Sequence, residues 1–470
     1  MDLPSYVAGK AVTSRQQITV KNPYSGQVVG TVPSLGREEV EKAVLSARAA
    51  PANLSRYERH SILARARSLL DDRAQEFARL ITSESGLALR DTTYEVGRAS
   101  DVLRFASMEA LRDDGQSFSC DVSPQGKARK IFTLREPHAL VVAITPFNHP
   151  LNQVVHKVAP AVAAGAPVIL KPSERTPLSA IRCAELLFEA GLPRELLSVL
   201  LGPTSEVAEA LVRHPQVEVV SFTGSVDVGK RIASIAGYKK LALELGGNCP
   251  LIVLEDADLD LAARLAAEGS FKNSGQRCTA VNRILVEEKV LEEFTGRLLE
   301  RAREYRSGDP MDPETRVGTV ISEESAVRLE GLVRKAVQDG ARVLSGGTRR
   351  GALLSPTVLA NVKRESEIVA RESFGPLAPI VSVRDLEDAI ALANSTEHGL
   401  SAGVVTRSME KAILAVKTVR AGTVNINEVP GFRTESSPFG GVKDSGLGVK
   451  EGVIEAIKWM TYVKTFSIPW

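Results

Sequence analysis

One segment of the chain places a possible nucleophile where a thiol could react. Cys278 directly follows Arg277 in the glycine-containing run Phe271-Lys-Asn-Ser-Gly-Gln-Arg-Cys-Thr-Ala280. A neighbouring cation and exposed backbone N–H groups lower the pKa of a thiol toward its nucleophilic thiolate form. The alternative is a small buried hydrophobic cysteine, which describes most intracellular cysteines. This segment alone leaves both interpretations open.

A carboxylate upstream bears on that choice. Glu244 ends an apolar run in Leu243-Glu-Leu-Gly-Gly-Asn248. A cysteine that attacks a carbonyl carbon and is later released by water needs a base to activate the water, and a glutamate beside two glycines suits that task. Glu244 as a capped surface residue is the alternative.

Four further motifs occur in a set order along the chain. They are Asn22-Pro-Tyr-Ser-Gly-Gln-Val-Val-Gly-Thr-Val32, Thr145-Pro-Phe-Asn-His149, Phe222-Thr-Gly-Ser225 and Pro438-Phe-Gly-Gly-Val-Lys-Asp-Ser-Gly446. Each motif alone is weak, but the ordered set is very specific. With the Glu244 and Cys278 segments in their places, the whole chain resembles the aldehyde dehydrogenase superfamily. The resemblance favours the catalytic interpretation of both residues.

The spacing of apolar residues predicts the elements that must position these groups. Charged and apolar residues recur at helical spacing within 37–111, and this pattern predicts amphipathic helices. Residues 116–136 alternate and predict two long strands joined by a turn. Short apolar runs separated by helical stretches predict a parallel sheet covered on both faces, with strands at 140–144, 168–170, 197–200, 217–221 and 241–245.

Three further structural expectations concern the rest of the chain. One helix should begin with Thr176 as N-cap and Pro177 in its first turn, and end at Gly191. A second α/β set runs from 250 to about 424. The tail, residues 459–468, reads as a strand, and we expect it to pair with the ribbon of a neighbouring subunit.

The resemblance implies an α/β fold of the aldehyde dehydrogenase type, with two doubly wound α/β domains and a β-ribbon oligomerisation arm. The expected NAD-binding domain covers residues 1–115 and 133–245, and the expected catalytic domain covers residues 246–437. Residues 116–132 and 438–470 are the expected oligomerisation and bridging segments. We therefore expect a homodimer or a homotetramer.

Composition excludes several classes of function. The 59 Lys and Arg residues nearly balance the 57 Asp and Glu residues, and no basic block carries interleaved aromatic residues, so nucleic acid is not an expected partner. The four cysteines have no paired short spacing, and the start of the chain lacks a basic and apolar leader, so we expect a cytoplasmic protein without membrane contact. The six histidines show no metal-binding grouping, so no metal is expected.

The expected cofactor is NAD in preference to NADP. The usual Gly-x-Gly-x-x-Gly fingerprint is missing after the first strand, but the resembled family binds its nicotinamide cofactor on a variant domain without it. In Lys171-Pro-Ser-Glu174, the Glu174 carboxylate would accept the ribose hydroxyls and repel a 2′-phosphate. The resemblance implies these cofactor residues: Thr145, Pro146, Phe147, Lys171, Ser173, Glu174, Gly202, Phe222, Gly224, Ser225, Val228, Glu372 and Phe374.

The implied chemistry is oxidation of an aldehyde to a carboxylic acid. Cys278 attack gives a thiohemiacetal, whose oxyanion the Asn148 amide and the Cys278 backbone N–H would stabilise. Loss of hydride leaves a thioester, and Glu244 would activate the water that hydrolyses it. Relatives that transfer the acyl group to coenzyme A generally lack this glutamate, so we expect a free acid as product.

The substrate is expected to be a short anionic aldehyde. Arg98 and Arg104 share a helix predicted over 94–111, but six residues of about 100° each set them roughly 240° apart, so only one of them can face the pocket. Arg98 matches the family's funnel position, although surface pairing with a neighbouring acid is equally open for either arginine. The expected cationic cup contains Arg98, His149, Arg277, Arg433 and Thr434.

Three stretches are most similar to phosphonoacetaldehyde dehydrogenases: residues 116–121, 149–156 and 441–448. The resemblance thus predicts oxidation of phosphonoacetaldehyde to phosphonoacetate, a step of phosphonate catabolism. The same cup also fits glyceraldehyde 3-phosphate in a non-phosphorylating reaction. Lactaldehyde, a sulfonate-bearing aldehyde and succinate semialdehyde are further alternatives. A non-catalytic binding protein is the reading from another class, and the presence of Cys278, Glu244 and Asn148 argues against it.

Overall fold

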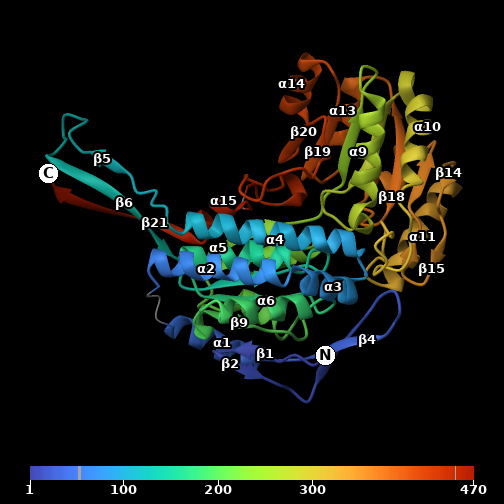
Figure 1. Cartoon of the computed structure of the whole chain (residues 1–470). Coiled ribbons are helices and arrows are strands. Elements are labelled where there is room, and N and C mark those ends of the chain that lie inside the picture. The colour runs from blue at the N-terminus through green and yellow to red at the C-terminus, as the bar shows by residue number, and fades with distance from the viewer. Residues whose placement is uncertain (51–53, 450) are drawn as a thin grey trace.

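The computed structural model describes residues 1–50, 54–449 and 451–470. Two lobes meet at an angle, and a thin β arm extends from the lower lobe (Figure 1). The lower lobe is formed mainly by the N-terminal half of the chain, and the upper lobe mainly by the residues from β12 (Cys249–Val253) to β20 (Thr423–Ile426). In the part of the chain that the structure describes, no helix is long and apolar enough to cross a membrane.

The lower lobe is built on a seven-stranded sheet of order β11-β10-β7-β8-β9-β1-β2. The five predicted runs all form strands, and these pair in parallel. They are β7 (Val141–Ile144), β8 (Val168–Lys171), β9 (Leu197–Val199), β10 (Val219–Thr223) and β11 (Lys240–Glu244). The strands β1 (Ser5–Val7) and β2 (Lys10–Val12) add an antiparallel edge.

Alternate residues of β7 point into two different cores, as the pleat of a strand requires. Val141 and Ala143 join a core that the helices of one face cover. Val142 and Ile144 join the core on the other face. The first face carries α2 (Arg56–Asp72), α3 (Ala74–Ser85), α4 (Leu89–Glu109), α5 (Asn152–Ala164) and α6 (Leu178–Glu189), and the second α1 (Arg37–Ala49), α7 (Ala208–Arg213) and α8 (Val226–Ile235).

The helices predicted within residues 37–111 are present as α1 to α4. The predicted cap of α6 is wrong. Thr176 donates through Oγ1 to the Phe147 carbonyl oxygen, and Pro177 occupies the N-cap position. The buried Glu84 carboxylate, from α3, accepts the Leu178 and Ser179 N–H groups at 2.7 and 3.1 Å. A side chain distant in sequence thus accepts the hydrogen bonds of the first N–H groups of α6.

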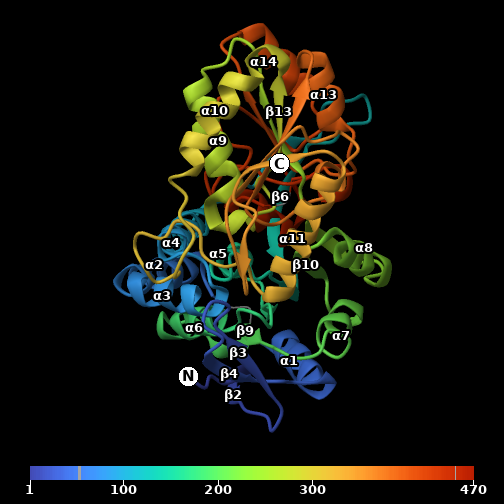
Figure 2. The same ribbon diagram turned by 90° about the vertical axis from the view of Figure 1, so that its right-hand side faces the viewer.

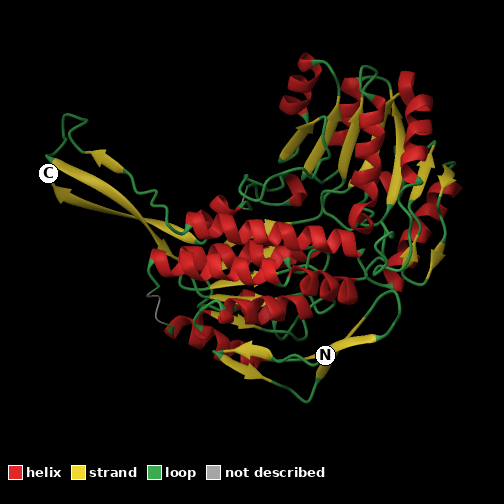
Figure 3. Cartoon of the chain, in the orientation of Figure 1, coloured by secondary structure: helices red, strands yellow, loops and turns green. Residues whose placement is uncertain are grey.

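The upper lobe contains a second seven-stranded sheet, of order β14-β17-β18-β13-β12-β19-β20. Figure 2 shows α9 (Leu259–Phe271) and α10 (Leu291–Ala302) on one side of β13 (Val281–Glu287), with α13 (Leu386–Asn394) on the other. The other strands of this sheet are β12 (Cys249–Val253), β14 (Arg342–Ser345), β17 (Thr357–Ala360), β18 (Leu377–Val383), β19 (Ser401–Val405) and β20 (Thr423–Ile426). The other helices of the upper lobe are α11 (Glu323–Gln338), α12 (Glu367–Ala370) and α14 (Met409–Thr418). Both lobes therefore stack helices on both faces of a mainly parallel sheet (Figure 3).

The arm differs from its prediction in two respects. Its first strand, β5 (Ser117–Ser119), has only three residues, whereas β6 (Arg129–Pro137) has nine. The tail forms β21 (Thr461–Pro469), as predicted, but it pairs antiparallel with β6 of the same chain along its full length. The tail lies directly after α15 (Val453–Trp459), which brings it back beside β6. The expected boundary after residue 132 falls inside β6.

Candidate active site

A tight turn between α9 and β13 presents Cys278. Asn273, Ser274 and Gly275 all have positive φ, at 59°, 53° and 68°. At Gly275 a Cβ atom would overlap the Gly375 carbonyl oxygen, so both the backbone angle and the available space require glycine. The chain then passes Gln276 and Arg277 and reaches Cys278 before β13 begins.

Asn148 is anchored to the same turn from the end of β7. Its Nδ2 donates to the Gln276 carbonyl oxygen at 2.8 Å, and its own carbonyl oxygen accepts from Asn273 Nδ2 at 3.1 Å. The amide nitrogen carries two hydrogens, so one is left for a ligand. Among the described residues, no group accepts a hydrogen bond from the Cys278 backbone N–H. These two donors are the pair that the sequence predicts for an oxyanion.

The thiol is protonated in the resting site, contrary to the sequence prediction of a lowered pKa. Burial raises the pKa of Cys278 to about 12. Among the cations, Arg433 counters this rise most strongly, while the nearby Glu372, Glu451 and Glu244 carboxylates add to it. Removal from water and the surrounding acids together outweigh the neighbouring arginine.

A small cavity of about 40 Å³ connects the predicted catalytic groups. Glu244, at the last position of β11, is buried and lines it together with Cys278. The β11 end is fixed by Leu245, whose N–H donates to the Ser445 carbonyl oxygen at 3.0 Å. The cavity also has an apolar wall that includes Leu400 and Phe439. A cavity of this size beside a thiol accommodates a short substrate.

The structure decides which arginine of α4 faces the cavity. Arg98 lines it, whereas Arg104 pairs with Asp101 on the helix surface at 2.9 Å and stacks on Phe105. Arg433 and His149 also line the cavity. Four of the five predicted substrate residues, Arg277 among them, therefore border one space with Cys278.

The side chains of two predicted substrate residues, Arg277 and Thr434, make hydrogen bonds to other parts of the protein. Arg277 borders the cavity, but its Nη2 donates to the Glu268 and Gly269 carbonyl oxygens at 3.0 and 2.7 Å. These carbonyl groups belong to the last turn of α9, where unpaired acceptors attract a guanidinium. Arg277 thus fastens the turn to the helix. The Thr434 hydroxyl bonds Ser436 at 3.3 Å, and Thr434 is not among the cavity-lining residues.

Two buried acids beside the cavity were missed by the sequence analysis. Glu435 pairs with Arg98 and with His156, and Glu451 pairs with Arg433 at 3.3 Å and with Lys157 at 3.8 Å. Burial raises the pKa of Glu451, but the Arg433 and Lys157 charges outweigh it and hold that pKa below its usual range. Glu435 lies two residues after Arg433, and an acid so close to a predicted cationic cup was a usable signal.

The C-terminal ends of the parallel strands gather the predicted cofactor residues of the lower lobe. Thr145, Pro146 and Phe147 follow β7, Ser173 and Glu174 follow β8, and Gly224 and Ser225 follow β10. Lys171 Nζ lies 3.3 Å from Glu174 Oε1. Ser225 is the N-cap of α8 without a side-chain cap bond, so the first N–H groups of this ten-residue helix are available to an anion. Gly202, Phe222 and Val228 flank the same edge, which fits a dinucleotide.

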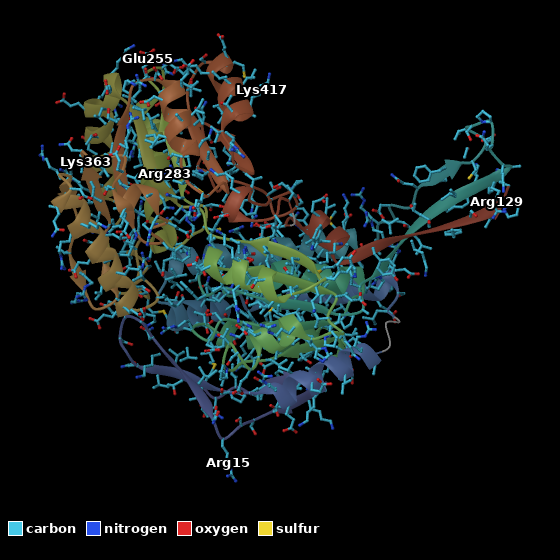
Figure 4. All side chains as sticks on the ribbon, turned by 180° about the vertical axis from the view of Figure 1, so that it is seen from behind. Arg15, Arg129, Glu255, Arg283, Lys363 and Lys417 are labelled. Carbon is cyan, nitrogen blue, oxygen red and sulfur yellow. The ribbon has the colours of Figure 1, made fainter. Side chains whose placement is uncertain are left out.

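The upper lobe supplies the other predicted cofactor residues. Glu372 Oε1 accepts the Gly247 N–H at 3.1 Å, and burial raises the pKa of this carboxyl group to about 8. The Phe374 ring meets Phe147 edge-on at 5.8 Å between centroids, so the two lobes touch here. Arg283, labelled inside the upper lobe in Figure 4, donates to the Asn248 carbonyl oxygen at 2.8 Å and so supports the Gly247 segment from below.

Comparisons with known proteins identify the family. The model of the aldehyde dehydrogenase family matches residues 10–466, and the chain belongs to that family. A 3-sulfolactaldehyde dehydrogenase of Priestia aryabhattai is 40% identical over 457 residues, which are 97% of this chain and 96% of that protein. A lactaldehyde dehydrogenase of Methanococcus maripaludis (strain C5 / ATCC BAA-1333) is 38% identical over 470 residues, covering 98% and 99%.

A solved structure gives the same result in three dimensions. The NADP-dependent glyceraldehyde-3-phosphate dehydrogenase from Bacillus halodurans C-125, complexed with NADP, is 35% identical and superposes with a TM-score of 0.97. The match covers 100% of this chain and 99% of that chain. The protein is therefore an oxidoreductase that acts on an aldehyde with a pyridine nucleotide, and the predicted fold class is confirmed.

Proposed function

We propose that the chain oxidises a short anionic aldehyde to its carboxylic acid with NAD, and that phosphonoacetaldehyde is the leading substrate. One observation carries the proposal. Arg433 lines the cavity with Cys278, and its Nη1 is buried without a hydrogen-bond partner among the described residues. A buried donor without a partner is costly unless a ligand supplies the acceptor. A phosphonate, sulfonate or carboxylate oxygen would do so.

The residues of the cavity divide the work of the reaction. Cys278 attacks the carbonyl carbon as a thiolate, its proton passing to solvent water, which gives the oxyanion of a thiohemiacetal. The free Nδ2 hydrogen of Asn148 and the Cys278 N–H stabilise the oxyanion. NAD, held by the residues that follow β7, β8 and β10, would supply the hydride acceptor. Glu244, which lines the same cavity as the thiol, then takes a proton from the water that hydrolyses the Cys278 thioester.

Two observations support NAD as cofactor and an anion as substrate. The Glu174 carboxylate follows β8 beside Lys171, where it would repel a ribose 2′-phosphate. Arg98 from α4 and His149 from the segment after β7 line the cavity together with Arg433. An anionic head group held between them would leave the aldehyde carbon at Cys278.

A second candidate is 3-sulfolactaldehyde. It is favoured by the 40% identical relative, whose name states that substrate. A sulfonate carries one charge where a phosphonate carries up to two, but both offer three oxygens to the same donors. Comparing NAD reduction with phosphonoacetaldehyde, 3-sulfolactaldehyde, glyceraldehyde 3-phosphate and lactaldehyde separates these candidates.

The anionic-substrate proposal is tested by Arg98→Ala. Loss of a charged contact in a desolvated pocket costs on the order of 2–5 kcal/mol, so kcat/KM for phosphonoacetaldehyde should fall roughly 30-fold to several thousand-fold. Propionaldehyde has no charge to pair and should lose far less. An Arg104→Ala variant is the matched control, because this arginine lies on the same helix but outside the cavity. Equal losses with both substrates would show that Arg98 is structural.

A further inference from the structure

Glu435 makes two contacts from one buried carboxylate. It is 5% exposed, and it stands in the loop between β20 and α15. Its Oε1 accepts from Nε of Arg98 on α4, and its Oε2 lies 2.6 Å from Nε2 of His156 on α5. The carboxylate thus connects the C-terminal segment to two helices of the lower lobe, next to the cavity.

The charges around Glu435 make it a fixed anion. Burial alone raises its pKa, but the His156 hydrogen bond and the Arg98 charge outweigh burial and hold the pKa well below its usual range. Truncating either side of such a pair would leave a buried charge without its partner, which is strongly unfavourable. The pair therefore persists under ordinary conditions, and the Arg98 guanidinium keeps one orientation.

The contact uses only one of the five N–H donors of Arg98. Nε faces Glu435, and among the described residues neither Nη1 nor Nη2 donates to any group. A guanidinium is planar, so anchoring Nε fixes the direction of both Nη groups. An arginine side chain has four rotatable torsions and would otherwise sample many rotamers, so ordering it on binding costs conformational entropy.

We propose that Glu435 is a positioning residue for substrate specificity: it orients Arg98 so that both Nη groups meet the anionic head group. The inference rests on the proposed function, since it presumes that Arg98 binds an anion. His156 bonds the second oxygen of the carboxylate and so fixes its orientation. The aldehyde carbon is thereby held at Cys278, while aldehydes without a charge gain nothing from the arrangement.

The test compares wild type, Glu435→Gln, Arg98→Ala and the double variant. We expect Glu435→Gln to raise KM and lower kcat/KM for phosphonoacetaldehyde on the order of 30-fold, because the head-group donors lose their alignment. Propionaldehyde should change by less than about 3-fold. In the Arg98→Ala background, Glu435→Gln should add almost nothing with either substrate. Asp101→Asn, which frees an arginine elsewhere on α4, is the control and should leave both substrates unchanged.

The possible outcomes separate this inference from the function on which it rests. Equal losses with both aldehydes in Glu435→Gln, or a full additional loss in the Arg98→Ala background, would overturn the positioning role. If Arg98→Ala itself affects both aldehydes equally, the anionic-substrate proposal fails instead. Thermal unfolding checks each variant. Should Glu435→Gln not fold, Glu435→Asp keeps the charge with a shorter reach, and it must show the same selective loss for the inference to stand.

Discussion

The resting thiol is poorly nucleophilic, because burial and the nearby carboxylates both disfavour its thiolate form. Cys278 has its pKa raised to about 12, so attack requires a base or a change of surroundings on ligand binding. Arg433 provides the main opposing charge, and it is itself paired with Glu451 at 3.3 Å. Protonation of the thiol at rest limits unwanted oxidation and alkylation, since the thiolate is the reactive form.

The role of Glu244 predicts a specific kinetic pattern. In Glu244→Gln the thioester should form but hydrolyse roughly 100-fold or more slowly, because the water loses its base. Rapid mixing with NAD and aldehyde should then show a burst of NADH close to one per site, followed by little steady turnover. Cys278→Ala should give no burst at all. Equal loss of the burst and the steady rate in Glu244→Gln would assign the base elsewhere.

Glu174 is expected to set the choice of cofactor. Wild type should use NAD better than NADP, and Glu174→Thr should narrow the difference in kcat/KM by roughly 5-fold, since the substitution removes about 1 kcal/mol of charge repulsion at a partly exposed site. Steady-state rates with both cofactors measure this. Lys171 is untouched in the variant, so NADP binding can gain from its charge. A wild-type preference for NADP would contradict the assignment.

Residue types and order predicted several of the residues that the structure brings together around the cavity, but not the direction of each side chain. Arg277 and Arg433 both lie near the thiol, and nothing local distinguishes them. The difference arises because the last turn of α9 offers carbonyl groups to Arg277, while Phe439 and Glu451 hold Arg433 at the cavity. Such partners come from distant parts of the chain, so sequence spacing does not reveal them.

At the scale of elements, the turn before Cys278 is where backbone geometry most directly serves the site. Gly275→Ala should lower the free energy of unfolding by roughly 2–4 kcal/mol, because it combines a positive φ with overlap at the Gly375 carbonyl oxygen. It should also lower kcat by displacing the thiol. Denaturant unfolding and steady-state rates measure the two effects.

A matched glycine serves as control for that prediction. Gly331 lies inside α11 with nothing within 4 Å of its would-be Cβ atom. Gly331→Ala should therefore leave activity unchanged and raise the free energy of unfolding by about 0.5–1 kcal/mol through helix propensity. If the two substitutions behaved alike, the turn geometry would not be what limits Gly275.

Helices and strands were predictable where the apolar periodicity is strong. Their ends were less predictable where a contact with a distant part of the chain sets them. Buried strands such as β7 and β8 read directly from apolar runs, because both faces of a parallel sheet are covered. The α6 cap was missed, since Glu84 lies in a different helix. β5 was predicted too long because alternation continues through a segment that finds only three pairing positions on β6.

At the scale of the whole molecule, the site depends on two lobes meeting. The lower lobe supplies Asn148, Glu244 and Arg98, and the upper lobe supplies Cys278 and Arg433. Glu435 and the edge-on contact of Phe147 with Phe374 tie the two together. The cavity therefore exists only where the lobes are held in register. This also explains why motifs scattered from 145 to 451 converge on a single space.

The arm extends away from both lobes (Figure 1), and the exposed apolar side chains that it carries predict self-association. Tyr462, Phe466 and Ile468 lie on one face of β21 and Trp470 directly follows the strand, and all four side chains are between 39% and 70% exposed. Labelled Arg129 lies near the tip of this arm, away from both lobes (Figure 4). Contiguous apolar side chains on a thin arm indicate a contact surface, so the expected homodimer or homotetramer should form through it.

The prediction is tested by Phe466→Asp combined with Trp470→Asp. Phe466 stacks on its register partner Phe132 at 5.5 Å between ring centroids, and Lys130 Nζ lies over the Trp470 ring. The β21–β6 pairing itself is made by backbone groups, which both substitutions retain. Light scattering after size exclusion should show a smaller assembly than wild type, since two charges would have to be buried at the interface. Tyr238→Ser, which removes a fully exposed ring outside β5, β6 and β21, is the control. An unchanged mass for the double variant would mean that the subunits associate through another surface.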